Sequence, residues 1–180
     1  MKSAIKSAIK TLKRNSSSSR YMVRCIAMLA LLISATLNAG VPSDPVTAAK
    51  DFYKHHENFY CSNPSTIQNL ITPRFYKALK RDHDAAQGEV GAIDSVPWTD
   101  AQDGDIHPPI TFTCLSNSGN RATVEMKYTF YLGKNRSWPQ KVIFHLEKQS
   151  ASPNWLISDL FTPRDGSLVN VIERYYKRYP

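Results

Sequence analysis

The side chains best suited to chemistry lie close together in one short segment of this sequence, residues 94–105. The segment holds four aspartates, and neighbouring carboxylates can carry out acid/base chemistry or hold a calcium ion. A calcium loop is not indicated, because the D-x-D-x-D-G ladder and its closing glutamate are absent. One hypothesis is a ligand or partner site on Asp94, Trp98, Asp100, Gln102 and Asp103. The alternatives are that the aspartates cap turns while Pro97 and Trp98 plug the open end of a sheet, or that the segment is disordered.

Two further residues could act as an acid or a base. Asp159 shares one side of a predicted strand with Trp155 and Ile157, so it is a partly buried carboxylate if that side faces inward. An ion pair with Arg74, or hydrogen bonds from backbone N–H groups, is the structural alternative. His56 lies on the apolar side of a predicted helix. A histidine there more often packs in the core than acts as a base.

Motifs for metals and cofactors are missing from the sequence. The five histidines form no H-E-x-x-H, and no C-x-x-C occurs. The sequence also lacks a phosphate-cradling glycine loop, a nucleophile elbow and a dinucleotide fingerprint. We therefore expect neither a metal nor a cofactor.

A leader accounts for the excess of positive charge. The 180 residues carry a formal net charge of +8, but residues 1–39 hold 7 of the 23 Lys and Arg residues and none of the 15 Asp and Glu residues. Residues 40–180 therefore carry 16 basic and 15 acidic groups. Nucleic-acid binding, which needs a basic stripe over much of a domain, is not expected of so neutral a domain.

The leader has the pattern of a cleaved secretory signal peptide. An uncharged run of 13 residues, 25–37, follows Arg24 and precedes the small residues Ala39 and Gly40. The run is too short for a permanent membrane anchor, which needs about 20 apolar residues. We expect a signal peptide over residues 1–39, with Met22 as an alternative start, and one periplasmic or secreted domain over residues 40–180. An organellar transit peptide is the alternative for the serine-rich start.

Removal of the leader leaves two cysteines, Cys61 and Cys114. An even number of cysteines in a chain sent to an oxidising compartment predicts a disulfide. Such a bond would contribute about 4 kcal/mol in the chain-entropy account. A catalytic thiol is the alternative, but Cys114 falls on the apolar side of a strand pattern.

Helical segments are predicted before and after a run of strands. Asp44 can cap a helix that begins at Pro45, and apolar residues then recur at helical spacing across residues 49–60. A second segment begins in the box Ser65-x-x-Gln68, and a third begins at Pro73. Ser167 caps a last helix. Its inward side is predicted to hold Leu168, Val171, Ile172, Tyr175 and Tyr179, with the cations outward.

Residues 110–161 alternate between apolar and polar side chains, as half-buried antiparallel strands do. The pattern predicts four strands, at residues 110–114, 122–132, 142–146 and 155–161. An irregular loop, residues 84–109, precedes them. We therefore expect an α+β fold in which N-terminal helices pack on a curved four-stranded antiparallel sheet that a C-terminal helix follows. This architecture resembles the cystatin-like and nuclear-transport-factor-like cone.

Three strings carry a closer resemblance. They are Asp94-x-x-Pro97-Trp98-Thr99-Asp100-Ala101-Gln102-Asp103, Leu70-Ile71-Thr72-Pro73-Arg74-Phe75-Tyr76 and Trp155-Leu156-Ile157-Ser158-Asp159-Leu160. Over about residues 45–175 the chain resembles the exported bacterial family called domain of unknown function 3828. Many members of that family are lipoproteins, and this chain departs from them because it lacks a suitably placed lipidation cysteine. The resemblance implies a fold and an envelope location, and no activity.

Two functions follow as hypotheses. The first is a non-catalytic exported module that binds an envelope protein or a small ligand near residues 94–109, with an inhibitor or immunity-type role included. The second is a small enzyme of the ketosteroid-isomerase type, which needs a carboxylate facing a tyrosine or a second acid in an apolar pocket. An exposed Trp98 would favour binding. A dry pocket around Asp159 or Asp103 would favour the enzyme.

Overall fold

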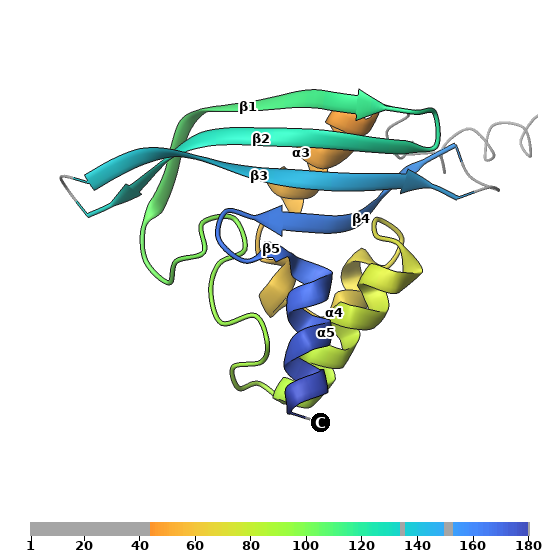
Figure 1. Cartoon of the computed structure of the whole chain (residues 1–180), viewed down its shortest axis with the longest axis vertical. Coiled ribbons are helices and arrows are strands. Elements are labelled where there is room, and N and C mark those ends of the chain that lie inside the picture. Colours follow the sequence, from red (N-terminus) through yellow and green to blue (C-terminus); the bar gives the residue numbers. More distant parts are fainter. Residues whose placement is uncertain (1–43, 134–135, 150–152, 180) are drawn as a thin grey trace, which may run out of the picture. The chain divides into compact units, whose positions relative to one another are not determined.

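The computed structural model describes residues 44–133, 136–149 and 153–179. They form an α+β fold with a five-stranded antiparallel sheet in the order β1-β2-β3-β4-β5 (Figure 1). The helices are α3 (Pro45–His55), α4 (Pro73–Ala86) and α5 (Leu168–Arg178), with short 3-10 helices η1 (Phe59–Cys61) and η2 (Pro64–Ile67). The strands are β1 (Asp105–Asn117), β2 (Arg121–Leu132), β3 (Arg136–Lys148), β4 (Trp155–Thr162) and β5 (Gly166–Ser167). The predicted signal peptide lies outside the described residues.

The predicted helix starts are confirmed at three places. Asp44 accepts a hydrogen bond from the N–H of Thr47 at 2.8 Å, and Pro45 occupies the first turn of α3. Thr72 caps α4 in the same way, and Ser167 caps α5. At η2 the cap is Asn63 instead of the predicted Ser65, since the side chain of Asn63 accepts from the N–H of Ser65.

The first helix is shorter than its apolar pattern predicts. α3 ends at His55, and His56 caps its end with non-helical backbone angles. Phe59 is still buried, but it reaches the core from η1, where its ring centroid lies 5.4 Å from that of Phe52. The spacing therefore identified core residues correctly and assigned them to one helix incorrectly.

The sheet has one strand more than predicted. Gly166 and Ser167 form β5, which pairs with Thr162 and Phe161 of β4. Two residues are too few for an alternating pattern, so the sequence carried no sign of this strand. β1 also begins at Asp105, within the segment predicted as a loop.

The core lies between the sheet and the helices. Figure 1 shows α3 behind β1, β2 and β3, while α4 and α5 lie side by side next to β4 and β5. Alternate residues of β2 and β3, including Val124, Met126 and Phe144, are fully buried against these helices. None of the described helices is long and apolar enough to cross a membrane.

The inward side of α5 differs from the predicted one. The buried residues are Leu168, Val169, Ile172 and Tyr176. Tyr175 and Tyr179 are 36% and 56% exposed, whereas Tyr176 is 8% exposed. The helix is therefore rotated relative to the prediction, because a three-tyrosine cluster offers two helical phases and packing selects the one that buries Tyr176.

Candidate functional site

Trp98 is a core residue, which corrects the hypothesis that it contacts a partner. Its side chain is 3% exposed and its ring packs 5.5 Å from Phe59 and 5.9 Å from Phe144, measured between centroids. Its indole Nε1–H donates to the carbonyl oxygen of Glu57 at 2.7 Å. The Tyr128 hydroxyl donates to the carbonyl oxygen of Trp98. Trp98 is therefore part of the packed core.

Asp100 holds two loops together. Its backbone has φ of 49°, in the left-handed region, and its carboxylate accepts from the N–H of Arg164. Burial raises the pKa of Asp100 above its ordinary value, although hydrogen bonds from Arg164 and Thr162 act in the opposite direction. This carboxylate joins the 96–101 turn to the β4–β5 connection.

The other three residues of the predicted site are exposed. The side-chain amide of Gln102 donates to the carbonyl oxygen of Asp94 at 3.4 Å, so these two residues lie together. Asp103 is exposed, and unlike Asp94 and Gln102 it does not line the cavity described below. The structure thus brings Asp94 and Gln102 together and places Trp98 in the core.

Asp159 caps α5. Its carboxylate accepts from the N–H of Leu160 at 2.8 Å, from the N–H of Val169 at 3.1 Å and from the hydroxyl of Ser167. Arg74 is paired instead with Glu173, at 3.2 Å. Both oxygens of Asp159 accept hydrogen bonds, so the second of the two structural alternatives, a carboxylate that caps backbone N–H groups, accounts for this residue.

His56 is half-buried at the end of α3, with its ring centroid 5.8 Å from that of Phe52. Burial lowers the pKa of this imidazole, and the neighbouring His55 lowers it further. Neither His56 nor Asp159 lines the cavity of about 440 Å³ described next.

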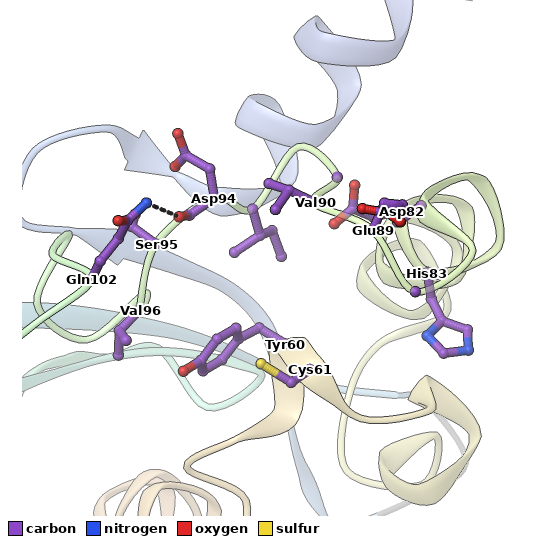
Figure 2. Close-up of a pocket in the computed structure, with 14 residues that line it drawn as sticks. Tyr60, Cys61, Asp82, His83, Glu89, Val90, Asp94, Ser95, Val96 and Gln102 are labelled. Atoms are coloured by element: carbon purple, nitrogen blue, oxygen red, sulfur yellow. Dashed lines mark hydrogen bonds between the residues drawn. The ribbon is translucent and has the colours of Figure 1, made fainter.

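A cavity of about 440 Å³ lies beside these residues, and we call it the loop pocket. Its walls come from η1, the C-terminal end of α4 and residues 88–102 (Figure 2). In Figure 2, Tyr60 and Cys61 lie across the cavity from Val90. Asp94, Ser95, Val96 and Gln102 close one end, and Asp82, His83 and Glu89 close the other.

The lining of the loop pocket combines apolar surface with carboxylates. Tyr60, Ile93 and Val96 are half-buried, and Val90 is 71% exposed at its edge. Glu89 and Asp94 are exposed carboxylates of the lining, which contains neither Lys nor Arg. A volume of this size falls in the range of small-molecule sites, roughly 300–1,000 Å³.

Asp82 of α4 fixes residues 91 and 92, beside the loop pocket, to α4 and α5. Its carboxylate accepts from the N–H of Ala92 at 2.6 Å and from the hydroxyl of Tyr176 at 2.8 Å. Gly91 fits tightly against it, because a Cβ at this position would lie 2.5 Å from Asp82 Oδ1. Sequence reasoning missed Asp82, although a single carboxylate among the inward residues of a predicted helix was a usable signal.

The two cysteines are unpaired in the structure. Cys61 is exposed and lines the loop pocket, next to Tyr60, whose pKa is raised by burial and by Cys61. Cys114 is exposed on the edge strand β1, where its Sγ lies 3.3 Å from the carbonyl oxygen of Ser116. The structure therefore does not contain the predicted Cys61–Cys114 bond. The pairing stays a prediction.

Within residues 44–179, apart from the two short undescribed gaps, no group of three or more His, Cys, Asp or Glu residues could hold a metal ion. The chain matches no family model, no curated protein and no solved structure. These comparisons lend no support to the resemblance to domain of unknown function 3828.

Proposed function

We propose that this chain is a non-catalytic binding module that holds a small, largely apolar ligand in the loop pocket. The observation that carries the proposal is the pocket itself, with its apolar surface left open beside a filled core. An apolar ligand would cover Val90, Ile93 and Tyr60 and remove their surface from water. The carboxylates of Glu89 and Asp94 would disfavour an anionic ligand.

The module is proposed to act in the cell envelope, after its leader directs export. The support is the sequence pattern of residues 1–39. We also propose that the sheet and helices form a cone of the cystatin-like or nuclear-transport-factor-like kind. The support is the order of elements, with a helical segment before an antiparallel meander and a helix after it.

Binding of the uncharged dye N-phenyl-1-naphthylamine tests the proposal, because its fluorescence rises in apolar surroundings. We expect a saturable increase with the unmodified protein. Val90→Ser should weaken binding about fifteenfold, since it removes two methyl groups and each one that a ligand covers is worth about 0.8 kcal/mol. Val90 is exposed, so this variant should fold normally.

Leu115→Ser is the matched control, because Leu115 is also an exposed apolar residue but lies on β1, away from the lining. Its dye affinity should equal that of the unmodified protein. A signal that does not saturate, or an equal loss in both variants, would contradict the proposal.

A further inference from the structure

Charge is unevenly distributed in this domain. Residues 82–105 contain seven Asp and Glu residues and neither Lys nor Arg. In contrast, α4 and α5 carry seven Lys and Arg residues, at positions 74, 77, 80, 81, 174, 177 and 178. A domain with almost no net charge therefore collects basic groups on two adjacent helices.

Three of the four basic residues of α4 lie on the side of that helix nearest α5: Arg74, Lys77 and Arg81. Arg74 pairs with Glu173 of α5, and a guanidinium N–H of Arg81 donates to the carbonyl oxygen of Tyr176 at 3.0 Å. These contacts show that the side of α4 bearing Arg74 and Arg81 faces α5. Lys77 lies four residues before Arg81 and so follows the same side of the helix.

Most of these cations are not neutralised. Arg74 pairs with Glu173, and Lys80 pairs with Asp84. For the other five, no carboxylate of the described residues lies within ion-pair distance. All five are exposed: Lys77, Arg81, Arg174, Lys177 and Arg178. Their uncompensated charge favours an anionic partner.

Two exposed aromatic rings border these cations. Tyr175 and Tyr179 lie one helical turn apart with ring centroids 5.1 Å from each other, and Arg178 lies 6.0 Å from the ring of Tyr179. Their neighbour Tyr176 is buried, so packing leaves this pair outside. Tyrosine has an apolar body and a polar tip, which suits the boundary between lipid headgroups and acyl chains.

We propose that this surface docks reversibly on a bilayer that contains anionic phospholipids. We call it the basic helix face: Lys77, Arg81, Arg174, Lys177 and Arg178, with Tyr175 and Tyr179. The cations contact headgroup phosphates, and the two tyrosine rings enter the headgroup layer. Such peripheral docking needs no membrane-spanning segment and is independent of the loop pocket.

Vesicle sedimentation tests the proposal with the protein as it accumulates after export. Vesicles of phosphatidylglycerol and phosphatidylethanolamine should bind the protein, and vesicles of phosphatidylcholine alone should not. Added salt should release it, because headgroup attraction is screened. The double variant Arg174→Gln/Arg178→Gln should bind about twenty-five-fold more weakly, since each cation near an anionic surface contributes about fivefold.

Tyr175→Ser/Tyr179→Ser should also weaken binding, while the release by salt persists. The matched control is Lys50→Gln/Lys54→Gln, which removes two exposed cations from α3 and should leave binding unchanged. All the substituted residues are exposed, and thermal melts establish that each variant is folded.

Three outcomes would overturn the proposal. They are equal binding to both kinds of vesicle, an equal loss in the α3 control, and binding of duplex DNA that is at least as tight and equally sensitive to the arginine variants. The last result would assign the surface to nucleic acid instead of lipid.

Discussion

Trp98 fills the space between α3, η1 and β3, and its removal should cost much more than the removal of an exposed tryptophan. Trp98→Ala should lower the free energy of unfolding by about 3–5 kcal/mol, because it opens a cavity and leaves the Glu57 carbonyl without its indole donor. Denaturant unfolding measures this change. Trp138→Ala on β3 is the control and should cost about 1 kcal/mol, since Trp138 is partly exposed. Equal losses would show that Trp98 is not a core residue.

Tyr176 should make stability depend on pH in the alkaline range. Burial, together with its hydrogen bond to Asp82, raises the pKa of Tyr176 to about 12 from an ordinary value of 10.0. The folded state therefore holds the phenolic proton more tightly than the unfolded state. The resulting stability is complete below pH 10 and is lost as the pH rises toward 12.

Tyr176→Phe isolates this contribution. Near neutral pH the variant should be about 1 kcal/mol less stable, because Asp82 loses one of its two donors. The difference from the unmodified protein should shrink as the pH rises above 10, since phenylalanine has no proton to lose. Urea unfolding at a series of pH values measures it, and two parallel stability curves would contradict the assignment.

At the scale of elements, sequence signals that act over a few residues predicted helix starts and buried strand residues well. Features that depend on contacts between distant elements were not predicted. The caps Asp44 and Ser167 and the proline Pro73 marked helix starts correctly, because these signals act within three residues of sequence. The alternation in β2 and β3 likewise predicted most of the buried side chains, although Glu125 of the polar set is buried as well. The phase of α5 depended on contacts with α4 and the sheet, which sequence spacing cannot supply.

The sequence indicated the segment in which the candidate site lies, but not all of the residues that form it. The irregular composition of residues 84–109 drew attention to the segment that forms much of the wall of the loop pocket, and Asp94 and Gln102 do line that pocket. Trp98 could not be told apart from a surface anchor, because an aromatic residue in a loop serves either purpose. Tyr60 and Cys61 approach from a distant part of the sequence, so only the fold could place them there.

For the molecule as a whole, the distribution of charge separates residues 1–39, the predicted leader, from residues 40–180. The seven cations of residues 1–39 are unaccompanied by acids, whereas the later chain is nearly neutral in total and polarised in space. A measurement on the uncleaved chain would mix the charge of the leader with that of the basic helix face. A chain that begins at residue 40 therefore measures the domain alone.

Export should remove the leader near Ala39 without disturbing the domain. A cut there leaves Gly40 as the new first residue and keeps Asp44, whose carboxylate caps α3 through the N–H of Thr47. The capped start of the helix is thus retained, and the melting temperature should match that of a chain begun at residue 40. Intact mass of the exported protein locates the cut. A mass that still includes Cys25, or a membrane-bound species that salt does not release, would contradict a cleaved leader and a peripheral mode of docking.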